Sequence, residues 1–312
     1  MKYNILITGG AGYIGSKLST ELVNMKYNVT VLDNLMFSKN SLNHLFAYKN
    51  FKFVKGDVTN KKILTKYLKN KHFVIPLAAL VGAPLCDKFK KKAVQVNLDA
   101  IKLIVKLLKK NQKIIYPTTN SGYGIGEKGK YCDENSPLNP ISLYGKTKAD
   151  AEKEILKNKN SICFRLATVF GYSYRMRTDL LVNNLTFRAY KTKKLSIFQP
   201  NFRRNYIHIN DIVRAFVFAI ENFNRLKGEI YNLGLSSANL TKIQLANKIK
   251  KSLPKTKIQI IKNMQDPDKR DYFVSNKKIE KKGFKAIYSL ENGINELLNV
   301  FENSDLKIKN NY

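Results

Sequence analysis

The sequence predicts an α/β fold in which a doubly wound parallel sheet carries a smaller C-terminal α/β lobe. Short apolar segments alternate with segments of helical period through the first half of the chain, and the first apolar segment ends in a glycine-rich turn. Uninterrupted apolar strands separated by helices are typical of a parallel sheet that is covered on both faces. Right-handed crossovers between such strands make the sheet doubly wound.

The expected strands are short and apolar, and they cover residues 3–8, 28–33, 51–55, 73–77, 113–117 and 161–166. The expected helices between them cover residues 12–25, 61–70, 93–110 and 144–158. After about residue 170 the pattern is less regular, with expected helices at 179–192, 211–222, 241–252 and 290–301 and strands at 229–233 and 257–261. We therefore predict one domain over residues 1–170 and a smaller lobe over residues 171–312, with residues of about 205–225 returning to the first domain.

Composition excludes several classes of protein. With 44 % hydrophobic and 25 % charged residues, the chain is neither a disordered protein nor a membrane protein. The N-terminus lacks the pattern of a secretory signal. Cys86, Cys132 and Cys163 lie too far apart for a disulfide framework or a cysteine metal site, and the three histidines are equally isolated. We expect a cytoplasmic protein that binds no metal.

The net charge of +33 has two interpretations. A strongly basic protein can bind nucleic acid or an anionic membrane. Here 47 of the 56 basic residues are lysines spread along the whole chain, whereas proteins that read nucleic acid use clustered arginines. Abundant Lys, Asn and Ile are what an AT-rich genome encodes. We interpret the charge as a solvated surface and expect neither a nucleic-acid partner nor a membrane partner.

A glycine loop follows the first expected strand. Gly10, Gly12 and Gly15 have the spacing G-x-G-x-x-G of a Rossmann domain, in which the glycines permit a tight turn, a close approach of pyrophosphate and close packing of helix on strand. Asp33 ends the second strand, where a carboxylate accepts hydrogen bonds from the adenosine ribose and repels a 2′-phosphate. We therefore expect NAD rather than NADP. Lys39, the nearest following basic residue, is the one feature that argues for NADP.

A tyrosine and a lysine supply the second pattern. Tyr144 and Lys148 are four residues apart and share one face of an expected helix. A nearby ammonium favours phenolate, so we expect Lys148 to lower the pKa of Tyr144 and make it a base for a substrate alcohol. Thr118, Thr119 and Ser121 follow the fifth strand, where a hydroxyl can polarise the same oxygen. The alternative is that they are ordinary turn residues.

These residues together resemble the NAD-dependent epimerase/dehydratase family of extended short-chain dehydrogenases/reductases. The resemblance covers nearly all of the chain and includes the glycine loop, Gly56-Asp57-Val58, Leu77-Ala78-Ala79, Asn97, Tyr123-Gly124, Tyr144/Lys148, Arg204-Asn205-Tyr206-Ile207-His208 and Asp268-Lys269-Arg270-Asp271. It implies NAD as cofactor, a nucleotide-diphosphate sugar as substrate and a homodimer. Residues 1–170 would then bind NAD, and the lobe would bind the nucleotide sugar.

The resemblance also implies roles for individual residues. Thr119 would act with Tyr144 and Lys148 in catalysis, and Arg204 and Arg270 would hold the diphosphate, because guanidinium groups contact phosphate oxygens at two points. The implied cofactor contacts are Gly9, Gly12, Tyr13, Ile14, Gly15, Asp33, Asn34, Asp57, Val58, Leu77, Ala78, Ala79, Asn97, Thr118, Tyr144 and Lys148. The other implied substrate contacts are Asn120, Ser121, Arg177 and Asn183 or its neighbour Asn184. For Arg175, Arg177 and Arg203, surface ion pairs are the alternative to substrate contact.

The activity implied by the resemblance begins with oxidation at carbon 4 of the sugar. Release of the ketone defines a 4-dehydrogenase, its reduction on the other face a 4-epimerase, and loss of water a 4,6-dehydratase. Dehydratases of the family carry an Asp-Glu pair directly after the catalytic threonine, where this chain has Asn120 and Ser121. We therefore expect no dehydration.

A narrower resemblance favours the dehydrogenase. The stretches Leu80-Val81-Gly82-Ala83-Pro84, Thr119-Asn120-Ser121-Gly122 and Arg175-Met176-Arg177 are similar to bacterial surface-polysaccharide enzymes, most closely to GDP-glycero-manno-heptose 4-dehydrogenases. A nucleotide-sugar 4-epimerase is the alternative, because both use the same residues. An inactive NAD-sensing regulator is disfavoured, since such proteins usually lose the Tyr/Lys pair.

Overall fold

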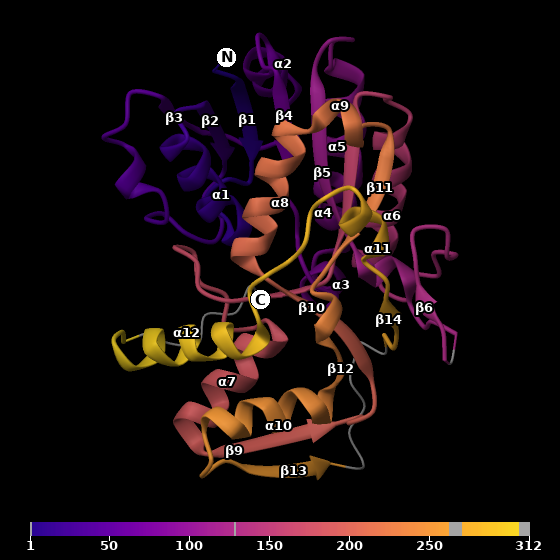
Figure 1. The fold of residues 1–312 in the computed structure, drawn as a ribbon. Coiled ribbons are helices and arrows are strands. Elements are labelled where there is room, and N and C mark those ends of the chain that lie inside the picture. The colour runs from indigo at the N-terminus through magenta and orange to yellow at the C-terminus, as the bar shows by residue number, and fades with distance from the viewer. Residues whose placement is uncertain (1, 128, 262–269, 306–312) are drawn as a thin grey trace.

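The computed structural model of this chain describes residues 2–127, 129–261 and 270–305. Seven parallel strands form its central sheet: β1 (Asn4–Thr8), β2 (Asn28–Asp33), β3 (Phe51–Lys55), β4 (Phe73–Pro76), β5 (Lys113–Thr119), β7 (Ser161–Leu166) and β11 (Glu229–Leu233). Their order is β11-β7-β5-β4-β1-β2-β3 (Figure 1). The chain reverses its direction across the sheet between β1 and β4, which is where such sheets bind ligands. The predicted fold class is confirmed.

Helices cover both faces of the sheet (Figure 1). One face packs on α1 (Tyr13–Asn24) and α8 (Ile209–Glu221), and the other on α2 (Lys61–Leu68), α5 (Ala100–Leu107) and α6 (Leu143–Leu156). Along β1, Ile5 and Ile7 join the first core, whereas Leu6 joins the second, and all three are fully buried. Burial of alternate residues on opposite faces explains why the strand sequence is uninterruptedly apolar.

The smaller lobe has a core of its own. Helices α7 (Leu181–Thr192), α10 (Lys242–Ser252) and α12 (Leu290–Glu302) pack around buried aliphatic residues, among them Val182, Leu245 and Leu297. Two small sheets complete the lobe: β8 (Thr168–Phe170), β10 (Arg203–His208) and β12 (Asn239–Thr241) form one, and β9 (Lys194–Phe198) pairs with β13 (Lys257–Ile261). The lobe lies below the sheet in Figure 1, beyond the carboxyl ends of its strands.

The chain returns from the lobe to the first domain. After β10, helix α8 packs on the sheet beside α1, and β11 becomes the edge strand next to β7. This return starts within the predicted segment 205–225 and extends past it to Leu233. The lobe is therefore joined to the sheet by several chain crossings rather than by one linker.

The expected helix over 93–110 is interrupted. The chain forms α4 (Lys90–Val94), one wide π-helical turn (Gln95–Asp99) and then α5. The wide turn contains Asn97, whose buried amide accepts from the backbone N–H of Leu80 at 2.8 Å and donates to its carbonyl at 2.9 Å. The sequence also gave no signal for several short elements, namely α3 (Ala83–Lys88), β6 (Tyr131–Cys132), α9 (Phe223–Leu226), β14 (Phe273–Val274) and α11 (Lys277–Lys281).

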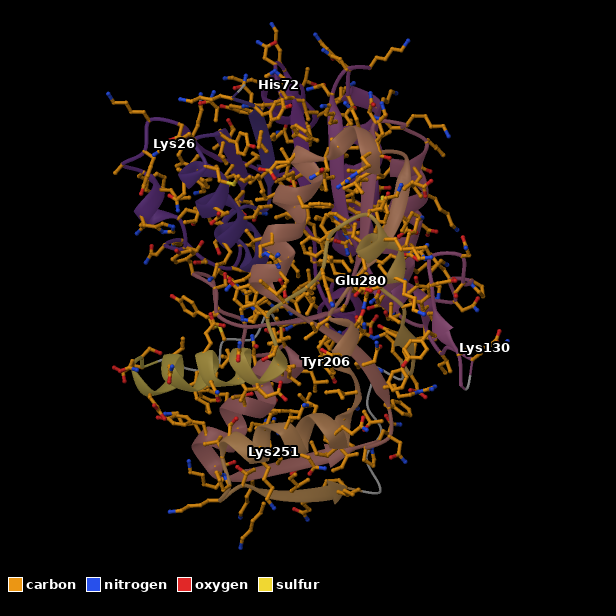
Figure 2. The ribbon with its side chains drawn as sticks, viewed as in Figure 1. Lys26, His72, Lys130, Tyr206, Lys251 and Glu280 are labelled. Atoms are coloured by element: carbon orange, nitrogen blue, oxygen red, sulfur yellow. The ribbon has the colours of Figure 1, made fainter. Side chains whose placement is uncertain are left out.

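Lysines extend from all sides of the molecule. Figure 2 shows Lys26, Lys130 and Lys251 pointing outward from widely separated places, whereas Tyr206 is buried. This distribution agrees with a solvated lysine surface. In the part of the chain that the structure describes, no helix is both long enough and apolar enough to cross a bilayer.

A buried ion pair joins α6 to β7. The Arg165 guanidinium donates to both carboxylate oxygens of Glu152, with Nη2 2.7 Å from Oε1, and to the hydroxyl of Tyr123 at 3.0 Å. The two charged side chains are 4 % and 3 % exposed. Because α6 carries Tyr144 and Lys148, this pair fixes the helix that positions them.

Replacing Arg165→Met leaves the Glu152 carboxylate buried without its partner, and we expect the free energy of unfolding to fall by about 3 kcal/mol. Urea unfolding followed by circular dichroism measures the change. The matched control is Lys157→Met, which removes an exposed pair with Glu154 on the same helix and should cost less than about 0.5 kcal/mol. Equal losses of unfolding free energy in the two variants would contradict the interpretation that Arg165 and Glu152 form a buried ion pair that stabilises the fold.

Candidate active site

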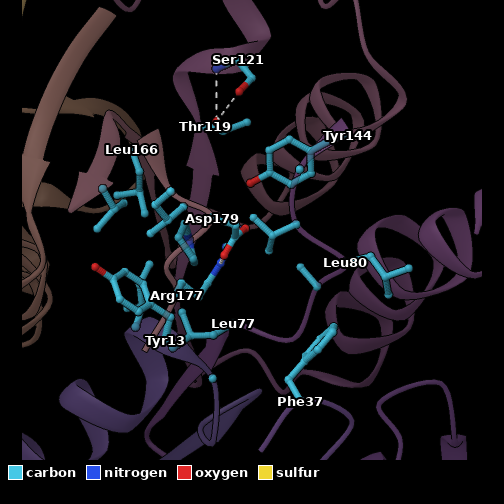
Figure 3. A pocket seen from close by; sticks show the side chains of 18 of the residues that line it. Tyr13, Phe37, Leu77, Leu80, Thr119, Ser121, Tyr144, Leu166, Arg177 and Asp179 are labelled. Carbon is cyan, nitrogen blue, oxygen red and sulfur yellow. Dashed lines mark hydrogen bonds and ion pairs between the residues drawn. The ribbon is translucent and has the colours of Figure 1, made fainter. Parts of the chain in front are cut away.

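A cavity of about 590 Å³ lies between the carboxyl edge of the sheet and the lobe. Among the residues predicted for the site, all line it except Gly10, Asn97, Asn120, Asn183 and Arg203. Figure 3 shows its centre, with Tyr13 and Leu77 on one side and Thr119, Ser121 and Tyr144 on the other. The sequence-predicted cofactor, substrate and catalytic residues therefore share one space.

The glycine loop forms the floor of the cavity. Gly9 has φ +71°, and a Cβ at this position would come within 2.4 Å of the Ala78 backbone nitrogen at the end of β4. A Cβ at Gly15 would lie 2.4 Å from the Gly9 carbonyl, whereas one at Gly10 would strike Val31 of β2. The tight turn that we assigned to Gly10 thus belongs to Gly9, and Gly10 instead permits close packing on β2.

The first turn of α1 suits an anion. Its N-cap residue, Gly12, offers no side-chain hydrogen bond to the first backbone N–H groups, and Gly12, Tyr13, Ile14 and Gly15 line the cavity. A helix N-terminus of this kind attracts phosphate through its N–H groups and its dipole. These residues therefore fit the pyrophosphate of a dinucleotide.

The carboxylate of Asp33 marks the other end of the cavity. Its Oδ2 accepts from the Ala11 N–H at 3.0 Å and its Oδ1 from the Leu35 N–H at 2.8 Å, which fixes the group at the end of β2. Burial raises the pKa of Asp33, although these two N–H groups oppose the shift. Asn34, Asp57 and Val58 line the same region. This arrangement fits an adenosine ribose.

Helix α6 delivers Tyr144 to the cavity. Ser142 caps the helix by accepting from the Gly145 N–H at 3.1 Å. Gly145 lets the helix approach the turn after β5, because a Cβ there would lie 3.0 Å from Pro140 and 3.1 Å from the Ser121 carbonyl. In Figure 3 the hydroxyl of Tyr144 points into the cavity.

Two hydroxyl groups lie beside Tyr144. Thr119, the last residue of β5, accepts from the Ser121 N–H at 3.1 Å, and the two side-chain oxygens are 2.9 Å apart. Arg270 donates a hydrogen bond to the Ser121 hydroxyl, so a cation from the lobe reaches the turn that follows β5. Asp268 and Lys269, which belong to the same motif, lie outside the described residues.

Burial shifts the pKa of both members of the Tyr/Lys pair. Burial raises the pKa of Tyr144 to about 12, although Arg177, Arg270 and a hydrogen bond with Thr119 act in the opposite direction. Burial lowers the pKa of Lys148 to about 7, and its Nζ lies 3.9 Å from the centre of the Tyr116 ring. Without NAD, burial therefore outweighs the cations that lower the pKa of Tyr144, and the two cations that act on it, Arg177 and Arg270, come from the lobe. The lower pKa that we expect from Lys148 together with the positive nicotinamide ring stays a prediction.

Three predicted asparagines lie behind the cavity wall. Asn97 holds the backbone of Leu80, which itself lines the cavity. Asn183 accepts from the Gly171 N–H at 3.0 Å and donates to the Arg177 carbonyl at 2.8 Å. The Asn120 amide is buried and has no hydrogen-bond partner within the described ranges. Their direct ligand contacts stay predictions.

The arginines have different positions. Arg177 lies in the cavity, where its Nε contacts Asp179 at 3.1 Å and the two side chains are 9 % and 6 % exposed. Arg204 and Arg175 also line the cavity and are nearly fully buried. Arg203 does not line it and instead pairs with Asp271 at 2.8 Å, which matches the ion-pair alternative.

Sequence reasoning gave no role to several residues that line the cavity, namely Phe37, Asp179, Arg188, Phe198 and Lys242. Asp179 had one usable signal, since it stands two residues after Arg177, at a spacing that allows a local ion pair. The others come from loops and helices of the lobe whose positions depend on tertiary packing.

The fold and the residues that line this cavity fit an enzyme that binds a dinucleotide cofactor. The sequence model of the NAD dependent epimerase/dehydratase family matches residues 5–234. The chain therefore belongs to this family, and NAD is its cofactor.

Among the curated relatives, YtcB of Bacillus subtilis, named an uncharacterized UDP-glucose epimerase, is 30 % identical over 247 residues, which cover 74 % of this chain and 76 % of the relative. A putative UDP-glucose 4-epimerase of Methanocaldococcus jannaschii is 26 % identical and is covered almost completely, at 96 % of this chain and 99 % of the relative. A trifunctional UDP-glucose 4,6-dehydratase of Arabidopsis thaliana is 28 % identical across 95 % of this chain, which spans only 46 % of that longer protein.

Solved structures of nucleotide-sugar epimerases and dehydratases have the same fold as this chain. The UDP-glucuronic acid 4-epimerase of Bacillus cereus, in complex with UDP-glucuronic acid and NAD, matches with a TM-score of 0.84 and 25 % identity over 96 % of this chain and 99 % of the other. A dTDP-glucose 4,6-dehydratase of Bacillus anthracis in complex with NAD has the same TM-score at 24 % identity over 97 % of each chain, which shows the fold alone.

The buried ammonium predicts a pH-dependent stability. Between a folded-state pKa of about 7 and an unfolded-state pKa of about 10.4, the unfolded chain binds the Lys148 proton and the folded chain does not, so stability rises with pH. From pH 7 to pH 9 the wild type should gain about 2 kcal/mol of unfolding free energy more than Lys148→Met. Denaturant unfolding at the two pH values measures the difference.

The control for this measurement is Lys146→Met, which removes an exposed lysine from the same helix and should leave the wild-type pH dependence unchanged. A Lys148→Met variant with the same pH dependence as the wild type would show that the ammonium is not held in a desolvated place.

Proposed function

We propose that the chain is an NAD-dependent nucleotide-sugar oxidoreductase that oxidises the C4 hydroxyl of the sugar to a 4-keto sugar, of the GDP-heptose 4-dehydrogenase type that serves surface-polysaccharide synthesis. The observation that carries the proposal is the shared cavity. It connects the glycine loop, Tyr144 with Thr119, and the lobe arginines Arg204 and Arg270. A cofactor, an alcohol and a diphosphate could be held there at once, and guanidinium groups suit the diphosphate.

The chemistry of the first step follows from these side chains. NAD, when bound, supplies the acceptor for the hydride that leaves carbon 4 and brings a positive charge close to Tyr144. Tyr144 as phenolate accepts the proton of the substrate hydroxyl, and the Thr119 hydroxyl donates a hydrogen bond to the same oxygen. Arg177 and Arg270 favour the phenolate, since both lower the pKa of Tyr144. Lys148 would hold the nicotinamide ribose.

Dehydration is disfavoured by the groups beside Thr119. Elimination of water needs an acid and a base near the sugar, and the two positions after Thr119 carry a buried amide, Asn120, and a hydroxyl, Ser121. Neither titrates near neutral pH. The carboxylate of Asp179 does line the cavity, but it is engaged by Arg177 through two hydrogen bonds.

A 4-epimerase is the second candidate. The relatives in Bacillus subtilis and Methanocaldococcus jannaschii carry UDP-glucose epimerase names, and the Bacillus cereus structure is a 4-epimerase. An epimerase returns the hydride to the other face of the ketone. A dehydrogenase releases the ketone and needs a second oxidant to regenerate NAD.

The proposal includes a cytoplasmic homodimer. The family resemblance pairs the helices around residues 93–110 and 144–158 across a two-fold axis. In support, Leu98, Leu103 and Val105 stay half-buried in the single chain, at the surface of the core under α5.

Incubation with UDP-, GDP- and dTDP-sugars decides the outcome, with the product read by mass spectrometry and NMR. We expect a GDP-linked heptose to lose two hydrogens and to yield one NADH per ketone. An unchanged mass with a new stereocentre at carbon 4 would establish the epimerase instead. Loss of water would contradict the assignment of Asn120 and Ser121, and no reaction at carbon 4 with any sugar would contradict the proposed function.

Tyr144→Phe should lower turnover by roughly 10²–10⁴-fold, because the variant lacks the group that accepts the proton. NAD binding, measured by calorimetry, should change by less than about tenfold, since the phenol contributes at most one hydrogen bond to the cofactor. The matched control is Tyr131→Phe, at a tyrosine that is 57 % exposed and outside the cavity. Unchanged turnover in Tyr144→Phe would remove Tyr144 from the mechanism.

A further inference from the structure

A segment of the lobe, residues 171–179, crosses to the glycine-loop helix; we call it the crossing segment. Tyr13 of α1 donates its hydroxyl to the Gly171 carbonyl at 2.7 Å, and Ser173 donates to the Tyr13 carbonyl at 2.6 Å. The side chains of Ser16 and Ser173 are 3.0 Å apart, and all of these contacts are buried. The start of the crossing segment is thus fixed on the helix that begins at the phosphate site.

The crossing segment then brings Arg175 to the adenosine end of the cavity. Arg175 lines the cavity, is only 7 % exposed, and lies with its guanidinium carbon 5.1 Å from the centre of the Phe37 ring. Phe37 stands four residues after Asp33, in the loop that leaves β2, and lines the same cavity. A guanidinium of the lobe therefore packs on the loop that follows Asp33, and both charged groups line the same cavity.

The two charges act on each other. Burial raises the pKa of Asp33, and Arg175 is among the groups that lower it. Burial lowers the pKa of Arg175 to about 10, assisted by Arg177, and Asp33 is among the groups that raise it. Groups that shift each other in this way are close enough for their charges to be partly balanced.

We propose that Arg175 is a cofactor-specificity residue: it stands at the ribose edge beside Asp33 and is the ligand that a 2′-phosphate would find there. A nearby arginine is what accommodates the 2′-phosphate in dinucleotide sites that take NADP, whereas a carboxylate excludes it. In this chain both the Arg175 guanidinium and the Asp33 carboxylate are present, and the carboxylate sets the preference for NAD over NADP. Removing the Asp33 carboxylate alone therefore shifts the preference from NAD toward NADP, because the Arg175 guanidinium is already in place. This inference needs only the NAD site and does not depend on the proposed sugar chemistry.

Lys39 is the competing source of positive charge. It follows Phe37 by two residues, but it is exposed and does not line the cavity. An exposed ammonium is screened by water and salt and contributes little to a buried phosphate contact. Arg175 is the better placed of the two, and the experiment separates them.

Calorimetric titration with NAD and NADP, without any sugar, tests the proposal. The readout is the ratio of the two dissociation constants, because effects on the shared part of the cofactors cancel in that ratio. Asp33→Ser should shift the ratio toward NADP by at least about tenfold, since a 2′-phosphate then meets a cation without a repelling carboxylate. Adding Arg175→Met to Asp33→Ser should shift it back by roughly ten- to a hundredfold.

Two further double variants make the result specific. Asp33→Ser with Lys39→Met should keep the ratio of Asp33→Ser within about twofold, and Asp33→Ser with Arg175→Lys should keep part of the NADP gain, because the charge remains but the two-point contact does not. Thermal unfolding of each variant verifies that it is folded. The proposal would be overturned if adding Arg175→Met to Asp33→Ser left the ratio of dissociation constants unchanged. It would also be overturned if adding Lys39→Met removed the gain in NADP binding.

Discussion

The close approach of the glycine loop to the end of β4 is the constraint on which the site depends. With a Cβ at Gly9 only 2.4 Å from the Ala78 nitrogen, no side chain fits between the loop and the neighbouring strand. This contact places the N-terminus of α1 at the switch point of the sheet and leaves room above it for a pyrophosphate. Because parallel strands end at the same edge, Thr119 of β5 and Asp33 of β2 face the same cavity from opposite sides. The cofactor and the reacting alcohol would therefore both bind within this one cavity.

The lobe completes the electrostatics of this site. Helix α6 supplies the half-buried phenol of Tyr144 and the buried ammonium of Lys148, and desolvation disfavours the charged form of each. The cations that favour phenolate, Arg177 and Arg270, come from the chain after residue 170, and so does Arg175 beside Asp33. The first domain alone would therefore have the residues that line a dinucleotide site but not the lobe arginines that shift the pKa values of Tyr144 and Asp33. The several chain crossings and the hydrogen bonds between Tyr13 and the crossing segment keep the lobe in place.

Local pattern was sufficient for much of the fold. The strands at 28–33, 51–55 and 161–166 have the predicted bounds. Those at 28–33 and 161–166 are largely buried, which favours apolar residues along the strand, whereas the edge strand at 51–55 exposes Lys52 and Lys55. The glycine loop, Asp33 and the Tyr144/Lys148 pair were predictable for a similar reason, since each is a short spacing tied to one junction of strand and helix.

Other features could not be predicted in this way because they arise from contacts between distant segments. The turn at Gly9 rather than Gly10 depends on how closely Val31 and Ala78 approach the loop. The wide turn at Asn97 depends on the backbone of Leu80, 17 residues earlier. The position of Arg175 depends on Phe37 and on the anchoring of Ser173. The burial of Lys148, which lowers the pKa of its ammonium, is a property of the packed core and cannot be read from a four-residue spacing.

The most direct test of the central claim is the pKa of Tyr144 with and without bound NAD. Chain labelled with ¹³C at the tyrosine ring carbon that bears the hydroxyl gives one NMR signal per tyrosine, and the Tyr144→Phe variant assigns the relevant one. If Tyr144 stands beside the positive nicotinamide ring, its pKa should fall from about 12 by at least about one unit when NAD binds. A pKa that NAD leaves unchanged, with binding verified in the same sample, would contradict the placement of Tyr144 at the reacting end of the cofactor.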